Sequence, residues 1–459
     1  MSTDTGSSLV SRYFLLTYHG YFVGQKEGSR IWLTSHAPVD QESLLSFEFA
    51  TTNLSTEFAE FLANATSGRN TVSLPRIGEV IMTSKRHRLL VSFEKESKYL
   101  AAEPSGALIC NRANVGVWEE FLLISQASFE HLQLIFSNAW IISSNRKIVK
   151  SADLSIEAGL QLKLGTTRFY LPTTLPLESH FAPFRFQLYR DGWKFDEILL
   201  YRPLIYYVAK GSYATEQLFL SLKSLVKFGG FNGQVLVYTD LSAAQILESV
   251  SELTSDQIQV RQHPAKDRVG FVMGRFSVLD EPFAHDHAPV VYMDCDIIYN
   301  NNIQSLLVDM TCSAGPSAPV EHFSRLSVSP SVGAELLQLD NERPELACGF
   351  NAGTFAVPNL KHFGYIWNIM RRIAQSFLAL HGRESLRFVD QEVANYLSYK
   401  YSPVYTHEVS KYVRWGWSED GDRLGVLSGL VHFWGVDRNS RSSVMKNYLK
   451  ILERHYDPG

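Results

Sequence analysis

The sequence has little that would tie the protein to a membrane or to nucleic acid. Its 459 residues contain no uninterrupted apolar run of the ~18 residues that a membrane-spanning helix needs. Lysine and arginine number 43, and aspartate and glutamate number 47, so the net charge is −4. Without a basic excess, the chain has no general electrostatic attraction to phosphate backbones. We therefore expect no membrane span and no nucleic-acid partner.

Cysteine is also scarce. The four cysteines are Cys110, Cys295, Cys312 and Cys348, and no two are close in sequence. This usage is typical of a reducing compartment rather than of a disulfide framework. The first eight residues are polar and lack the basic and then apolar pattern of a secretion signal. These observations predict a cytoplasmic protein.

The chain is long enough for two or three domains of about 100–200 residues, and it has two different rhythms. Residues 1–166 contain short alternating apolar runs separated by Gly, Ser, Asn and Lys, which predicts an all-β domain. Residues 167–198 contain three prolines and little periodicity, which indicates a connector. From residue 199 to 459, short apolar strands alternate with helical patterns, which predicts an α/β domain with a parallel sheet.

The all-β region contains an internal repeat. Residues 21–28 and 99–106 both have an aromatic residue, a small turn and a glycine seven positions on, and residues 140–147 form a weaker third copy. Residues 98–121, the most specific stretch, resemble the repeat of fascin-like β-trefoil domains in a Tyr-Leu strand, an Asn-Arg turn and a Trp-Glu-x-Phe strand. The resemblance implies three units that close a barrel with pseudo-threefold symmetry.

The chemistry is concentrated in the second half of the chain. The apolar run of residues 289–293 predicts a buried strand that leads directly into Asp294-Cys295-Asp296. Because side chains alternate along a strand, the two carboxylates would face the same side. Two adjacent carboxylates at a strand end are costly unless a cation lies between them. Oxygen ligands of this kind suit Mg²⁺ or Mn²⁺.

Residues 291–298 resemble the metal-binding strand of glycosyltransferases with the GT-A fold, in particular the glycogenin-containing family (family 8). Further segments similar to that family follow in the same order and together span about residues 199–450: 209–220, 274–276, 349–355, 389–391 and 431–435. The resemblance implies a Rossmann-like nucleotide-sugar domain after the β-trefoil.

The resemblance also implies roles for single residues. Asp294, Asp296 and His432 would bind Mn²⁺ or Mg²⁺, and Asp390 and Gln391 would be the catalytic pair that orients the donor sugar. The donor would contact Ala209, Tyr213 (beneath the uracil), Arg275, Asn351, Gly353 and Gly435. The family's Lys-Pro-Trp segment is replaced here by residues 436–441, so Arg438 is the best substitute for its β-phosphate contact.

These roles imply a hexosyltransferase-like enzyme that moves a sugar from UDP to an acceptor hydroxyl with retention. The metal would neutralise the charge that develops on the leaving diphosphate. Front-face attack is favoured, and double displacement stays open. The acceptor, whether a glycan, a protein or a small molecule, is not indicated. An inverting transferase and a sugar-nucleotide pyrophosphorylase are rival enzymes. The rival of another class is a catalytically silent module that binds glycans or proteins through the trefoil.

Each residue also has a structural alternative. Tyr213 could cap a helix start, Arg275 could form a surface ion pair, and Asp390-Gln391 could serve as polar groups at a helix start. His432 could be a core histidine. Trp415 and Trp417 could stack on an acceptor sugar or pack in the core. His285 and His287 resemble a metal pair, but they precede the predicted strand at its amino end and are interpreted as a surface loop.

Overall fold

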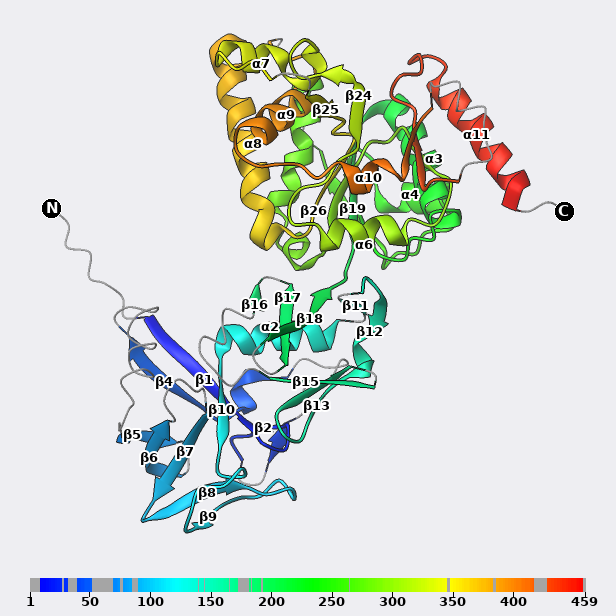
Figure 1. The fold of residues 1–459 in the computed structure, drawn as a ribbon. Helices are drawn as coiled ribbons and strands as arrows, with labels where there is room; N and C mark the ends of the chain where they lie inside the picture. The colour runs from blue at the N-terminus through cyan, green and yellow to red at the C-terminus, as the bar shows by residue number, and fades with distance from the viewer. Residues whose placement is uncertain are drawn as a thin grey trace. The chain divides into compact units, whose positions relative to one another are not determined.

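A computed structural model gives the fold as two compact units, Met1–Leu200 (unit 1) and Tyr201–Gly459 (unit 2), each described by itself (Figure 1). The structure describes residues 9–26, 29–31, 39–51, 69–74, 77–84, 90–138, 140–143, 145–164, 166–171, 181–182, 184–190, 193–263, 265–344, 347–382, 385–416 and 427–456. Among these residues, no helix combines the length and the apolar character needed to cross a membrane.

Unit 1 begins with a sheet of two similar strand–hairpin–strand groups. Strand β1 (Leu9–Thr17) pairs antiparallel with β4 (Ser46–Thr51) and with β10 (Phe121–Ser125), and β10 pairs with β7 (Leu90–Lys95). The stretch from β1 to β4 contains the first copy of the sequence repeat (residues 21–28), and the stretch from β7 to β10 contains the second (residues 99–106). The other strands of this sheet are β2 (Phe22–Val23), β3 (Arg30–Ile31), β5 (Arg69–Leu74), β6 (Gly78–Ser84), β8 (Lys98–Ala102) and β9 (Leu108–Arg112).

The third copy of the repeat lies in a second sheet. Its strands β11 (Trp140–Ser143) and β12 (Ile148–Lys150) form a hairpin, and β11 pairs with β18 (Trp193–Leu200). The remaining strands of this sheet are β13 (Leu154–Glu157), β14 (Gln161–Leu164), β15 (Thr167–Tyr170), β16 (Phe181–Ala182) and β17 (Arg185–Arg190). The described strands thus form two sheets, and a barrel with threefold symmetry stays a prediction.

The connector expected at residues 167–198 contains strands β15 to β18 of this second sheet. Phe186 and Ile198 are fully buried in the same core as Phe14 and Phe121, so unit 1 continues to Leu200. Helix α2 (Gln126–Ser137) covers this core, with the Phe129 ring 4.8 Å from that of Phe14. The sequence did not separate a strand-forming segment from a linker here, because its prolines obscured the alternation.

Unit 2 is built on a mainly parallel sheet in the order β21-β20-β19-β22-β26. Strands β19 (Leu204–Ala209), β20 (Gln234–Thr239) and β21 (Ile258–Gln262) follow one another outward, and β22 (Val290–Met293) lies on the other side of β19. Strand β26 (Thr354–Val357) is antiparallel to β22. The strand order therefore reverses between β19 and β22, and ligands of parallel sheets bind outside the carboxyl ends of strands at such a point.

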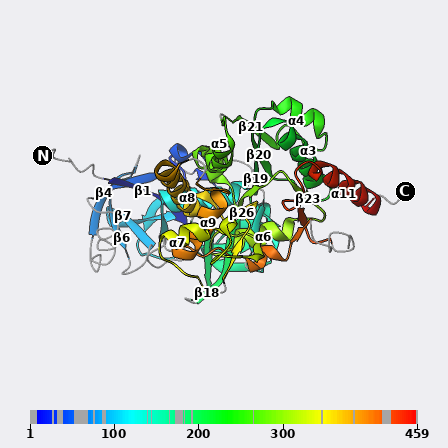
Figure 2. The ribbon, with the colours of Figure 1, turned by 90° about the horizontal axis from the view of Figure 1, so that it is seen from above.

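Helices flank this sheet, and smaller sheets extend it. In both views α8 (Leu360–His381) and α9 (Asp390–Lys400) lie on one side of β19 and β26, with α3 (Gly211–Lys227) and α11 (Arg441–Tyr456) on the other (Figure 1, Figure 2). The smaller sheets are β23-β28-β27 and β24-β25, formed by Ile297–Tyr299, Leu430–His432, Val413–Trp415, Val320–Arg325 and Cys348–Phe350 in that order.

The remaining helices are short. The α-helices are α4 (Ala243–Ser249), α5 (Arg268–Met273), α6 (Gln304–Cys312), α7 (Ala334–Leu339) and α10 (His407–Ser410). The described 3-10 helices are η1 (Gln41–Ser43), η2 (Ser151–Asp153), η4 (Gly274–Asp280), η5 (Pro282–Asp286) and η6 (Pro330–Val332). Unit 2 is therefore an α/β unit with a core of its own, in which Trp367 of α8 packs against Tyr206 of β19.

Candidate active site

Three side chains with metal-ligating atoms meet beside the carboxyl end of β22. Asp294 and Asp296 lie between β22 and β23, and His432 is the last residue of β28, in register with Ile297 of β23. The His432 Nε2 atom lies 3.1 Å from Asp296 Oδ1 and 3.7 Å from Asp294 Oδ2. The three ligand atoms lie within 4.8 Å of one another. Asp296 and His432 are buried, whereas 32% of the Asp294 side chain is exposed, so the cluster opens on one side.

The local backbone explains this convergence better than strand alternation does. Strand β22 ends at Met293, and a turn carries Asp296 back toward His432. The Asp294 amide donates to the Gly353 carbonyl at 2.7 Å, which fixes the start of the turn against the segment before β26. The intervening Cys295 is buried, and its thiol lies 3.4 Å from the Val208 carbonyl of β19.

Gly353 leaves open the space between two of the ligand residues. A Cβ atom at this position would overlap Asp294 Oδ2 and lie 2.5 Å from His432 Cε1. Asn351 holds the glycine in place, because its Oδ1 atom accepts from the Gly353 amide at 2.8 Å while its Nδ2 atom donates to Glu321 Oε1 at 2.7 Å. The sequence predicted both residues as donor contacts. Gly353 lies at the carboxylate cluster. Both ends of the buried Asn351 side-chain amide are hydrogen-bonded to protein groups.

Each carboxylate of the cluster also has an arginine beside it. Arg441, the first residue of α11, donates to Asp296 Oδ2 at 2.6 Å, and Arg275 Nη2 lies 3.6 Å from Asp294 Oδ1. The Tyr292 hydroxyl donates to the same Asp294 oxygen at 2.6 Å. The negative charges of the two carboxylates are therefore partly compensated by the two guanidinium groups.

Burial and charge act in opposite directions on the pKa values of this cluster. Burial raises the pKa of Asp296, but His432 and Arg441 outweigh it, so the pKa lies below its ordinary value. Burial lowers the pKa of His432, but Asp296 and Asp294 outweigh it, so that pKa is raised. For Tyr292, burial raises the pKa well above its ordinary value, so its hydroxyl remains a donor to Asp294. The cluster thus keeps Asp296 ionised, as a metal ligand must be.

Asp390 and Gln391 join the same site through the turn that carries Gly353. Asp390 begins α9 and forms an ion pair with Arg275, with side-chain exposures of 5% and 14%. Gln391 Oε1 accepts from the Ala352 amide at 3.1 Å, and its Nε2 atom donates to the Ser331 carbonyl at 3.1 Å. Val389, just before them, has φ 51°, which is strained for a β-branched residue. Both predicted catalytic side chains are therefore fixed by protein groups.

The predicted nucleotide residues are also placed. Tyr213 lies in the first turn of α3, and the Arg438 guanidinium carbon lies 5.0 Å from the centre of its ring. Ala209 is the buried last residue of β19, and Gly435 lies exposed three residues after His432. Tyr213 and Arg438 therefore lie together although they are far apart in sequence. Two residues that contact the same nucleotide must lie this close to each other.

Two residues that contact the predicted metal ligands, Tyr292 and Arg441, were not singled out from the sequence. Trp415, which the sequence offered as an acceptor-stacking or a core residue, lies beside His432. The Trp415 ring lies 5.8 Å from that of His432, and the two residues are in register on β27 and β28. A signal for Arg441 was present, since it is a second arginine shortly after His432 at the start of a helical pattern. Trp417 lies outside the described residues.

The other histidine pair does not assemble a ligand set. His285 Nε2 lies 3.0 Å from the Leu279 carbonyl, and His287 Nδ1 lies 2.9 Å from the Phe283 carbonyl. Burial and the nearby Arg202 lower the pKa of His287 to about 4. Within the described part of the chain, Asp294, Asp296 and His432 are the group of acidic, histidine or cysteine residues close enough to share a metal ion.

Comparisons with known proteins give no sequence match. No family model matches the chain, and no curated protein matches it. Among solved structures, it is similar to the apo bifunctional glycosyltransferase WbbM, at 12% identity and a TM-score of 0.39, over 64% of this chain and 55% of WbbM. The chain thus spans only about 55% of the length of that protein.

Two further solved structures are similar to it. The galactosyltransferase LgtC, in complex with donor and acceptor sugar analogues, is 13% identical with a TM-score of 0.37, over 55% of this chain and 95% of LgtC. Mouse xyloside xylosyltransferase 1 in its apo form is 12% identical with a TM-score of 0.35, over 51% of this chain and 97% of that protein. All three are glycosyltransferases by name. At TM-scores this low, the likenesses do not decide the function, which is inferred below from the residues of the site.

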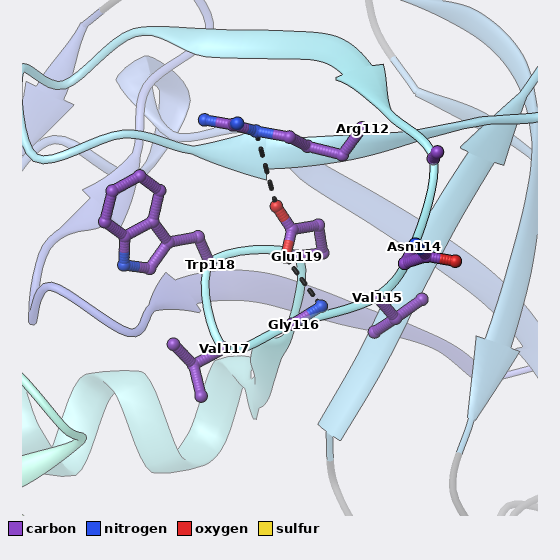
Figure 3. A pocket seen from close by; sticks show the side chains of 8 residues that line it. Arg112, Asn114, Val115, Gly116, Val117, Trp118 and Glu119 are labelled. Atoms are coloured by element: carbon purple, nitrogen blue, oxygen red, sulfur yellow. Dashed lines mark hydrogen bonds and ion pairs between the residues drawn. The ribbon is translucent and has the colours of Figure 1, made fainter.

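A separate hollow of about 460 Å³ lies in unit 1, lined by residues 112–119 (Figure 3). Glu119 lies between Arg112 and the Gly116 backbone, as the dashed lines in Figure 3 show, at 3.8 Å and 2.7 Å. The Arg112 guanidinium also lies over the Trp118 ring, at 5.7 Å. The residues that carried the trefoil resemblance therefore hold this loop together, and their contacts do not point to a ligand.

Proposed function

We propose that unit 2 is a metal-dependent glycosyltransferase that moves a sugar from UDP to an acceptor hydroxyl. The observation that carries the proposal is the convergence of Asp294, Asp296 and His432 beside the reversal point of a parallel sheet. Such a point is where this architecture binds ligands. Two carboxylates and an imidazole, with room left by Gly353, fit Mn²⁺ or Mg²⁺.

A cation bound there would supply positive charge to the diphosphate of the donor and to the leaving group. The residues of the chain prepare the site for it. Arg441 and Tyr292 each hold one carboxylate oxygen, Oδ2 of Asp296 and Oδ1 of Asp294, leaving the other oxygen toward His432. Arg275 links Asp294 to Asp390, so the metal cluster and the start of α9 are held in a fixed relation.

The donor base is assigned to Tyr213. Its ring offers a flat face beside the carboxyl end of β19, and the Arg438 cation over it can contact a phosphate as well as the ring. We propose retention by front-face attack, with Asp390 and Gln391 as positioning groups. The Asp390 side chain is only 5% exposed in its ion pair with Arg275, so little of its carboxylate is open to a sugar, which favours this role over that of a covalent nucleophile. No contact in the hollow of unit 1 that residues 112–119 line supports the alternative of a binding module that works through unit 1.

A screen of nucleotide sugars tests the proposal. The full chain is incubated with UDP, ADP and GDP sugars in Mn²⁺, and the released nucleotide is measured. Hydrolysis of a UDP sugar is expected, and it should stop in excess chelator and in Asp296→Ala. Full activity with chelator, or a preference for GDP sugars, would overturn the proposal.

Nucleotide binding gives a second readout that does not require turnover. UDP with Mn²⁺ should raise Tm more than GDP does, because a ligand that binds the native state stabilises it. Tyr213→Ala should weaken the binding of UDP by about tenfold, because the base loses its stacking partner. Tyr365→Ala, whose side chain is 57% exposed on α8, is the matched control and should bind UDP as the wild type does.

A further inference from the structure

Three aromatic side chains, one exposed and two partly exposed, form a corner next to His432. They are Phe323 of β24, Trp415 of β27 and Trp434, which follows β28. The rings of Phe323 and Trp434 are stacked, with centres 5.8 Å apart and planes at 25°. Trp415 stands nearly perpendicular to both, at 80° to Phe323 and 89° to Trp434. We call these three residues the aromatic corner.

The aromatic corner is continuous with the proposed metal site on two sides. Trp415 is in register with His432 on the neighbouring strand, with ring centres 5.8 Å apart. Phe323 lies on β24, whose partner β25 leads directly into Asn351 and Gly353. The strand pair β27–β28, which carries His432, and the strand pair β24–β25, which leads to Gly353, therefore both lie beside this corner. A group bound on it would lie near the site where the sugar is transferred.

The arrangement of the rings restricts what can bind. With ring centres 5.8 Å apart, Phe323 and Trp434 are in direct contact, which leaves no room for a ligand ring between them. The side chain of Phe323 is 47% exposed, and the exposed polar residues His322, Arg325 and Arg414 flank the corner on the same strands. A ligand that fits has a flat apolar face and a polar rim. A pyranose ring has this character, with C–H bonds on its faces and hydroxyl groups at its edge, whereas a lipid chain has no polar rim.

We infer that the aromatic corner is the acceptor subsite and that the acceptor is a carbohydrate whose pyranose ring stacks on Phe323. The inference rests on the proposed transferase function and adds to it the chemical class of the acceptor. Trp415 supports both His432 and the corner, so changing it would disturb the metal-ligating cluster as well. Phe323 lies on β24, which carries none of the metal-ligating residues, and it is therefore the position chosen to test acceptor binding.

The test measures binding of cellobiose, maltose and lactose to the full chain with UDP and Mn²⁺ present, by saturation-transfer NMR and calorimetry. At least one disaccharide should bind saturably and receive saturation at its ring C–H protons. Sorbitol, which has hydroxyl groups but no ring face, should not bind. Phe323→Ala and Phe323→Leu should each weaken the binding of the disaccharide by about tenfold. Phe323→Tyr should bind the disaccharide nearly as the wild type does. Tyr365→Ala is the control for loss of an exposed aromatic residue.

The outcomes separate the inference from the function on which it rests. UDP binding that needs Mn²⁺ in all variants, with no disaccharide bound or with Phe323→Leu binding as well as the wild type, overturns the carbohydrate subsite and leaves the transferase standing. Loss of UDP binding in Phe323→Ala with the disaccharide unaffected would place the nucleotide on the corner and overturn the assignment. Absence of UDP binding in the wild type overturns the proposed function itself.

Discussion

Arg441 donates a hydrogen bond to Asp296 at 2.6 Å, although the two residues are 145 positions apart in sequence. The same guanidinium donates to the carbonyls of Trp434 and Val436. It therefore fixes the segment after His432 to the carboxylate that His432 also contacts. Arg275 lies between Asp294 and Asp390, so three carboxylates share the positive charges of Arg441 and Arg275.

This partial compensation predicts that Mn²⁺ and UDP bind with positive coupling. A cation that enters a cluster whose carboxylates already have arginine partners gains less Coulomb energy, whereas its complex with a diphosphate is itself nearly neutral. Calorimetry should show weak Mn²⁺ binding alone and much tighter binding with UDP. Arg441→Met should strengthen Mn²⁺ binding in the absence of UDP and reduce the coupling. Arg454→Met, exposed in the last turn of the same helix, is the control; equal coupling in both variants would contradict the prediction.

Gly353→Ala should abolish Mn²⁺ binding while the fold survives. The added methyl group would overlap Asp294 Oδ2 and lie close to His432, so it occupies space that the ligands need. Gly364→Ala is the matched control. The nearest atom to its added methyl group is 3.5 Å away, and its helical position in α8 should gain about 0.5–1 kcal/mol in the free energy of unfolding. Electron paramagnetic resonance of Mn²⁺ measures binding, and unchanged binding in Gly353→Ala would refute the assigned site.

The ion pair between Arg275 and Asp390 should be structural as well as functional. Arg275→Met leaves a nearly buried carboxylate without its cation and should lower the free energy of unfolding by about 3–5 kcal/mol. The double variant Arg275→Met/Asp390→Asn should recover part of that loss, because no buried charge remains. Arg371→Met, whose partner Asp280 is 67% exposed, should cost less than about 1 kcal/mol. Urea unfolding measures all three, and equal losses for Arg275→Met and Arg371→Met would contradict the interpretation.

Glu392, two residues after Asp390, should make stability fall as pH rises. Burial raises its pKa from 4.5 to about 7, against hydrogen bonds from backbone groups of residues 387–389, and Glu335 adds to the shift. Because the folded state binds the proton more tightly, its contribution is fully present below pH 4.5 and is lost as pH rises through about 7. Glu392→Gln should flatten this slope between pH 5 and 8 (about the window of the shift). Glu248→Gln, exposed on α4, should leave the slope unchanged.

The boundary between the two units predicts a separable nucleotide-binding fragment. Each predicted donor and metal residue lies after Tyr201, and β18 ends at Leu200 in the sheet of unit 1. We propose that a fragment from residue 201 to 459 binds UDP with Mn²⁺, as followed by its Tm. Residues 1–200 should fold separately without binding UDP. Failure of a soluble fragment from residue 201 to bind UDP would show that the units are not functionally separable.

The sequence indicated which local elements form and which residues carry charge at their ends. The apolar run before Asp294 predicted a buried strand, and β22 is fully buried. Strand and helix alternation after residue 199 predicted a parallel sheet, which unit 2 contains. These features depend on neighbours in sequence, because periodicity and burial of one segment are encoded in that segment. The β-trefoil, the retaining mechanism and the cytoplasmic location stay predictions.

Only the tertiary structure decided which side chains meet. It paired Asp390 with Arg275, Asp296 with Arg441 and Tyr213 with Arg438, and it placed Gly353 at the metal-ligating cluster. It also placed β15 to β18 in a sheet where the sequence indicated a connector. Periodicity sets the face on which a side chain lies, but its partner depends on which segments pack together. For Arg441 and Asp296 that partner is 145 residues away, a distance at which no local pattern carries information.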